Sequence, residues 1–254
     1  MAGKSKQSAR DAFEANLADA NKLVSLVRAF ENRRPYRMRQ ERRERVGDAL
    51  DVKRADRGEL DWVVGDDIVV IFMPKSSYSR EDFAEPELRP LLRQALVAAC
   101  AAVETFAADR AKERLSQTLK TDPIPARLAD LPMTVADWLA IEARYERRGW
   151  GLREIIEAEF DKMASGSPSE IGKLMSAVGV KGVWNLVDTE RKTKKRRSEG
   201  ELTRIVERRN RIAHTGDRSG RGRAEISLAQ VEGDLACVRQ IVAALDAVTA
   251  PAGK

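Results

Sequence analysis

The chain has 254 residues, enough to bury a sizeable core in one large or two small domains. Its 43% hydrophobic and 34% charged residues exclude a chain that is disordered throughout and favour helices with long solvated faces. The net charge of +6 favours a polyanionic partner, and because we see neither a secretion signal nor an unbroken run of about 18 apolar residues, we expect a cytoplasmic protein that does not engage a membrane.

The N-terminal region, residues 1–80, combines three kinds of segment. Residues 8–30 place apolar side chains on one stripe, which predicts an amphipathic packing helix. Residues 33–45 are rich in arginine and form either a solvated helix face or an RNA contact surface. Residues 62–74 carry Val and Ile runs on both sides of Gly-Asp-Asp, which predicts a short β-hairpin whose aspartates sit in the turn and hold no metal. We expect this region to pack against the rest of the chain or to sense a signal.

A long apolar helix is predicted from Pro86 to about Leu119. The stretch around Cys100 is apolar on nearly every side, so Glu104, one turn later, is expected to face inward. An inward carboxylate requires a cation, and Arg209 is the candidate. The two residues either form a structural pair that ties two helices together, or Glu104 takes a direct part in catalysis.

Shorter helices follow. Thr134 and Asp137 form a capping signal ahead of the first of them. Both cysteines, Cys100 and Cys237, lie in apolar helical runs and are predicted to be buried thiols rather than a disulfide. We predict helices at residues 138–148, 152–163, 170–178 and 227–248, with Gly149 and Gly151 separating the first two.

The densest basic block, residues 191–197, is either a phosphate-binding surface, a localisation signal or a solvated loop. Ser198 to Glu201 after it predicts a capping box, and a helix with a clear apolar stripe follows. Arg209 falls on that stripe and therefore needs a carboxylate, a partner subunit or a ligand phosphate. His214, the only histidine, lies about 140° further round the helix. The two side chains converge only if the helix ends near His214, for which Gly216 provides a terminator, or if two subunits bring their copies together.

The run Arg209-Asn210-Arg211-Ile212-Ala213-His214 resembles the Arg-polar-x3-His signature of HEPN domains, dimeric all-helical RNases of prokaryotic defence and toxin systems. Residues 96–112, with Glu104 as the matching acidic residue, and residues 227–248 are similar to helices of that family. The resemblance covers roughly residues 85–250 and is closest to the RiboL-PSP type. It implies a mainly α fold: a HEPN-like antiparallel helical bundle, here with an N-terminal helical segment and a short β-hairpin.

The chemistry expected of this motif needs neither metal nor cofactor, because RNA carries its own nucleophile in the 2′-hydroxyl. His214 is the candidate acid or base, Arg209 stabilises the phosphorane-like transition state, Asn210 orients the histidine or the phosphate, and Glu104 supports them. One histidine cannot easily serve as both acid and base, so we expect a homodimer with a composite active site, as the resemblance also implies. The products would carry 2′,3′-cyclic phosphate and 5′-hydroxyl ends.

RNA is the expected partner, together with a regulatory protein or antitoxin that restrains the enzyme. No aromatic stacking platform is evident, so specificity is expected from shape, the N-terminal region or a partner. The residues predicted to contact RNA are Lys194, Lys195, Arg196, Arg197, Arg208, Arg211 and Arg218, the last in a mobile basic loop.

Two other classes of function stay open. A catalytically silent HEPN dimer would bind nucleic acid or a protein through the same basic segments. A purely structural helical module would bind no RNA at all. In both cases His214 would serve as a helix C-cap, where an imidazolium meets the last carbonyls of the helix.

Overall fold

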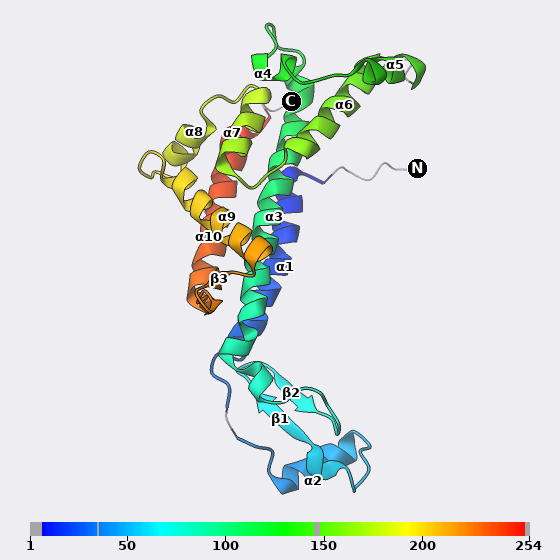
Figure 1. Ribbon diagram of the computed structural model, residues 1–254, viewed down its shortest axis with the longest axis vertical. Coiled ribbons are helices and arrows are strands. Elements are labelled where there is room, and N and C mark those ends of the chain that lie inside the picture. The colour runs from blue at the N-terminus through cyan, green and yellow to red at the C-terminus, as the bar shows by residue number, and fades with distance from the viewer. Residues whose placement is uncertain (1–6, 35, 145–147, 252–254) are drawn as a thin grey trace. The chain divides into compact units, whose positions relative to one another are not determined.

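The computed structural model describes residues 7–34, 36–144 and 148–251 (Figure 1). Within these ranges the chain forms ten α-helices and four short strands, which confirms the mainly α fold. Residues 1–6 of the N-terminal region and residues 145–147 of the predicted helix at 138–148 lie outside the described ranges. The helices are α1 (Ala9–Ala29), α2 (Gln40–Ala49), α3 (Glu85–Thr118), α4 (Ala126–Ala129), α5 (Val135–Arg144), α6 (Arg148–Met163), α7 (Pro168–Ala177), α8 (Val183–Glu190), α9 (Arg197–Thr215) and α10 (Leu228–Thr249). The remaining elements are β1 (Asp61–Val64), β2 (Val69–Phe72), β3 (Arg218–Ser219), β4 (Gly222–Arg223) and the 3₁₀ helices η1 (Arg57–Glu59) and η2 (Glu81–Phe83).

The chain divides into two compact units. The larger unit comprises residues 1–18, 96–224 and 233–254, and the smaller one residues 19–95 and 225–232. The sequence suggested a separation of residues 1–80 from residues 85–250. The units divide at other positions, because the residues of α1, α3 and α10 are shared between them.

The larger unit is built around α3. Phe13 of α1 and Phe106 of α3 meet edge-on with their ring centroids 6.1 Å apart, and both are fully buried. Arg110 of α3 forms an ion pair with Asp246 of α10. Among the described helices, α3 is long and apolar enough to cross a membrane by length and composition alone, but 61% of its apolar window is buried inside the protein. That burial is typical of a central core helix.

The middle helices follow the prediction except at one place. At the start of α5, Thr134 Oγ accepts the backbone N–H of Asp137 at 3.1 Å, which confirms the capping signal. The predicted break at Gly149 and Gly151 is wrong, because both glycines lie inside α6. Glycine lowers helix propensity by about 1 kcal/mol relative to alanine but retains its N–H donor, so flanking residues with good packing carry the helix through. Ile156 and Phe160, both buried further along α6, anchor the helix whose first turn contains the two glycines.

The smaller unit contains the predicted β-hairpin. β1 and β2 pair antiparallel with Val64 opposite Val69, and the two aspartates lie in the connecting turn. Asp66 donates its backbone N–H to the carbonyl of Ala29 at 2.8 Å. Gly65 permits this approach, because a Cβ at that position would lie 2.0 Å from the same carbonyl oxygen. The hairpin is thereby fastened to the end of α1.

Candidate active site

A contact from a neighbouring helix sets the start of α9, which carries the Arg209–His214 motif. The predicted capping box is wrong: the N-cap is Arg196, with a left-handed φ of 64°, and Ser198 is buried inside the first turn. The backbone N–H of Ser198 donates to Asp188 Oδ1 of α8 at 2.9 Å. Asp188 of α8 therefore caps the start of α9 in place of a residue that is local in sequence.

Arg209 faces α3, as its place on the apolar stripe predicts. Its Nη2 donates a hydrogen bond to Glu104 Oε1, and the same oxygen accepts the backbone N–H of Gly166 at 3.1 Å. The side chains of Arg209 and Glu104 are 22% and 30% exposed. The predicted pair is thus present, and because a guanidinium has five N–H donors, the pair leaves others for a phosphate.

The loop between α6 and α7 fits closely over this pair. A Cβ added to Gly166 would lie 3.3 Å from Glu104 Oε1 and 3.5 Å from Val206 Cγ2. The role of Gly166 was not predictable from the sequence, because a glycine in a Ser-Gly-Ser loop indicates only a turn. Its contribution comes from the backbone N–H and from the space that the missing side chain leaves for Glu104.

The cysteines near the site are unreactive. Cys100, one turn before Glu104, is fully buried, and burial raises the pKa of its thiol to about 11 although the positive charge of Arg209 opposes the shift. Burial also raises the pKa of Cys237 to about 11, and the Cys237 Sγ donates to Glu201 Oε2 at 3.3 Å. Both thiols are free, as predicted, although Cys237 is only half-buried. Protonated thiols are poor nucleophiles, so neither serves the site at neutral pH.

His214 lies in the last turn of α9 and is exposed. Gly216, with φ of 61°, ends the helix as predicted, and the backbone N–H of Asp217 closes it by donating to the Arg211 carbonyl at 3.0 Å. In the part of the chain that the structure describes, no hydrogen bond reaches the imidazole or the side chain of Asn210. Within one chain the structure therefore does not join His214 to Arg209, which faces α3.

The predicted RNA-contacting residues separate into two groups. Arg208 is 13% exposed and forms an ion pair with the fully buried Asp217, so it belongs to the fold and not to a free surface. Arg197 pairs with Glu201, yet its side chain is 64% exposed and remains at the surface. The predicted mobile loop after His214 contains the short β3–β4 hairpin. The other predicted residues are exposed: Lys194, Lys195, Arg196, Arg211 and Arg218.

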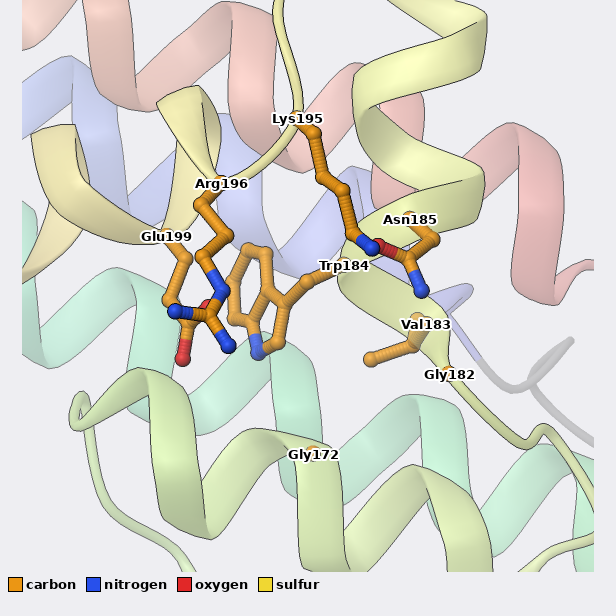
Figure 2. A pocket seen from close by; sticks show the side chains of 8 residues that line it. All are labelled: Gly172, Gly182, Val183, Trp184, Asn185, Lys195, Arg196 and Glu199. Atoms are coloured by element: carbon orange, nitrogen blue, oxygen red, sulfur yellow. The ribbon is translucent and has the colours of Figure 1, made fainter.

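Two of these exposed residues, Lys195 and Arg196, line a pocket of about 300 Å³ whose wall includes Trp184 (Figure 2). Figure 2 shows their side chains reaching into the hollow from the turn before α9, across from Gly172 of α7. Trp184 is half-buried and fixed in place, because its Nε1 donates to the Pro168 carbonyl at 2.8 Å. This aromatic wall was not predicted from the sequence. A tryptophan seven positions before the basic block at residues 191–197 was the available signal, and only the fold brings the two together.

The comparisons with known proteins bear on the whole site. Residues 72–249 match the family described as RiboL-PSP-HEPN, and this range includes Glu104, Trp184 and the entire Arg209–His214 motif. A search of the curated proteins and a search of the solved structures each found no match. In the described ranges no three His, Cys, Asp or Glu side chains gather in a way that would hold a metal ion.

Proposed function

Because this chain belongs to the RiboL-PSP-HEPN family, we propose that it is an endoribonuclease that cleaves RNA without a metal ion. HEPN domains are associated with nuclease or other RNA-related functions. The observation that carries the proposal is the placement of His214: the one imidazole of the chain is exposed at the end of a basic helix, one to two turns beyond a positioned arginine. Phage defence or a toxin system is the biological setting that we propose.

The proposed reaction uses the 2′-hydroxyl of the RNA as nucleophile. One His214 removes its proton, the 2′-oxygen attacks the adjacent phosphorus, and a second His214 protonates the departing 5′-oxygen. Arg209 donates hydrogen bonds to the phosphoryl oxygens as negative charge accumulates on them. The products carry a 2′,3′-cyclic phosphate and a 5′-hydroxyl.

Two copies of the chain are needed for this scheme, since each supplies one imidazole. A twofold axis near the end of α9 would place two copies of His214 and Asn210 across one cleft. The exposure of His214, and the absence of any partner for Asn210 among the described residues, support this arrangement, because both side chains are available to a second subunit or to RNA. We propose a homodimer, with a regulatory partner or antitoxin that restrains it.

The exposed basic residues support RNA binding in the same proposal. Arg211 and Arg218 flank His214, whereas Lys195 and Arg196 lie at the other end of α9 beside Trp184. Cations that contact phosphates and an aromatic face that receives a base form the usual combination for single-stranded RNA. Glu104 serves in this scheme as a positioning residue that holds Arg209.

A silent HEPN dimer is the second candidate, and the Arg209–Glu104 pair is the observation that favours it. An arginine neutralised by a carboxylate is a weaker stabiliser of a phosphorane than an unpaired one. Such a protein would bind RNA through the same cations and leave it intact.

End-labelled tRNA and total RNA incubated with the purified protein in EDTA, beside His214→Ala, test the two candidates. The enzyme proposal expects cuts with 2′,3′-cyclic phosphate ends that persist in EDTA and disappear in the variant. Glu207→Ala provides a control at another exposed position of α9 and leaves the imidazole and the basic residues in place. If the unsubstituted protein and His214→Ala both bind RNA and neither cleaves it, the silent dimer is favoured. Cleavage that survives in His214→Ala would refute the mechanism.

A further inference from the structure

The smaller unit contains a pocket of about 550 Å³ that the proposed RNase chemistry does not use. It lies between the basic stretch that follows α1 and the β1–β2 hairpin. Small-molecule sites typically have volumes of about 300–1,000 Å³. Its lining residues are Arg34, Tyr36, Arg37, Arg39, Arg42, Trp62, Val64 and Val69.

Two hydrogen bonds donated by backbone N–H groups hold in place the wall that carries the arginines. The N–H of Arg34 donates to the Val64 carbonyl at 2.9 Å, and the N–H of Met38 donates to Asp61 Oδ1 at 3.1 Å. Met38 is 2% exposed and belongs to a small apolar cluster with Leu60. The segment is therefore held along β1 at two points, and the pocket is a built feature of the unit.

The pocket has a strong excess of positive charge. Four of its lining residues are arginines and none is acidic. Among the described residues, no carboxylate lies within ion-pair distance of Arg34, Arg37, Arg39 or Arg42. Neighbouring arginines do have such partners: Arg45 pairs with Glu41, and Arg80 pairs with Asp61 of β1. Four exposed guanidinium groups around one hollow create a positive potential that attracts an anion with several charges.

The same pocket offers apolar and aromatic surface. The Arg42 guanidinium lies over the Trp62 ring, 5.3 Å from its centroid, and Tyr36 is 64% exposed. Val69 of β2 is 50% exposed. A flat aromatic group can stack on such surfaces while the arginine forks bind phosphate oxygens. A simple inorganic anion would leave the aromatic part of the pocket unused.

We propose that this pocket binds the polyphosphate and base of a nucleotide, either free as a nucleoside triphosphate or at the 5′ end of an RNA chain. The arginines match several phosphate charges, and Tyr36 with Val69 receives the base. Arg39 is also the N-cap of α2 and makes no side-chain cap, so the first N–H groups of that helix add to the positive field. The proposal stands apart from RNA cleavage, because none of its residues belongs to the Arg209–His214 motif.

Binding is measured by calorimetry with the full chain carrying His214→Ala, so that RNA probes stay intact. The probes are ATP, a short RNA with a 5′-triphosphate, and the same RNA with a 5′-hydroxyl. In that background, Arg37→Gln combined with Arg39→Gln should weaken binding of the phosphorylated probe by about tenfold or more, because charge-assisted hydrogen bonds to phosphate are lost. Tyr36→Ala should also weaken binding of this probe, because the base loses a surface on which it stacks. Arg45→Gln is the matched control on α2, since it removes an arginine that already has a partner.

Saturable ATP binding that the pocket variants weaken and the control does not supports a free nucleotide as the ligand. Preference for 5′-triphosphate over 5′-hydroxyl RNA, with the same dependence on the variants, supports an RNA end. The proposal is overturned if neither phosphorylated probe binds, or if both RNAs bind equally and the pocket variants behave like Arg45→Gln. The melting temperature of each variant serves as the check on folding. The assay measures only binding, so its result can be interpreted even if the proposed RNase activity is not found.

Discussion

Arg209 of α9 donates to the same carboxylate oxygen of Glu104 that accepts the backbone N–H of Gly166. One oxygen thus joins three segments of the larger unit: α3, α9 and the loop before α7. The position of the Arg209 guanidinium depends on this junction.

Removing the Glu104 carboxylate should cost stability as well as activity. Glu104→Ala is expected to lower the free energy of unfolding by about 1.5 to 3 kcal/mol, the range for hydrogen bonds to charged groups. Glu104→Gln retains an acceptor for Gly166 and should cost less, yet cleavage should fall in both variants because Arg209 loses its anchor. Urea unfolding and RNA cleavage measure the two effects. Glu207→Ala is the matched control, since Glu207 is exposed on α9; equal effects at the two positions would show that the pair stabilises nothing.

Gly166→Ala is expected to lower cleavage with little loss of secondary structure. The new Cβ would lie 3.3 Å from Glu104 Oε1, which forces the carboxylate and hence Arg209 to shift. In Gly200→Ala, by contrast, the added Cβ meets nothing within 4 Å, and α9 should gain stability by about 0.5 to 1 kcal/mol from the better helix former. Cleavage assays and thermal melts of both variants check the prediction. Unchanged cleavage in Gly166→Ala would mean that the junction tolerates displacement.

Alanine substitutions at Arg208 and Arg211 should have different effects, the first on the stability of the fold and the second on RNA binding. Arg208→Ala removes the cation that faces the buried Asp217 and should destabilise the protein by about 3 to 5 kcal/mol. Arg211→Ala removes an exposed side chain and should change stability by no more than about 0.5 kcal/mol while weakening RNA binding. Urea unfolding and filter binding at two salt concentrations give both readouts. The reverse order of the two stability changes would contradict the assignment of Arg208 to the fold.

Patterns local in sequence predicted much of this structure. The amphipathic stripe of α1, the β-hairpin and the Gly216 terminus of α9 each depend on residues close together in the chain, and all three are observed. The start of α9 was mispredicted because its cap comes from Asp188 on another helix. Arg208 looked like an RNA contact for a similar reason, since its partner Asp217 lies past a helix terminus that reverses the chain direction. Partners that lie nine or ten residues away, beyond the end of a helix, leave no periodic signal in a sequence.

Trp184 is expected to contribute to the affinity for single-stranded RNA. Trp184→Ala should weaken binding of an oligonucleotide by about 1 to 3 kcal/mol, the usual range for one stacked base. Lys195→Gln with Arg196→Gln should weaken it as well and leaves the hydrogen bond between Trp184 and Pro168 in place. Fluorescence anisotropy in the His214→Ala background measures both. An unchanged affinity in all of these variants would remove the pocket from the RNA-binding surface.

Acid should destabilise the protein through Asp188. Burial favours a higher pKa for this carboxyl, but hydrogen bonds from Ser198 and Thr193 outweigh it and hold the pKa below its ordinary value of 3.8. A carboxyl with a depressed pKa stabilises the folded state above the unfolded pKa, and this stabilisation is lost as the pH falls through the lower folded pKa. The free energy of unfolding should therefore fall below about pH 4. Urea titrations from neutral to acidic pH should show a weaker dependence in Asp188→Asn than in the control Asp130→Asn, whose side chain is exposed.

Phe13 of α1 packs against Phe106 of α3, and Glu14, its neighbour in sequence, pairs with Arg239 of α10 at 3.4 Å. During synthesis α1 leaves the ribosome long before α10 exists, so the packing of α1 stays incomplete until α10 has been translated. The candidate site lies on helices of this same unit, and Arg204 of α9 pairs with Asp234 of α10, so the packing of α9 is also completed only when α10 is present. A chain cut short before α10 therefore contains the whole motif but lacks the ion pair that joins the motif helix to α10.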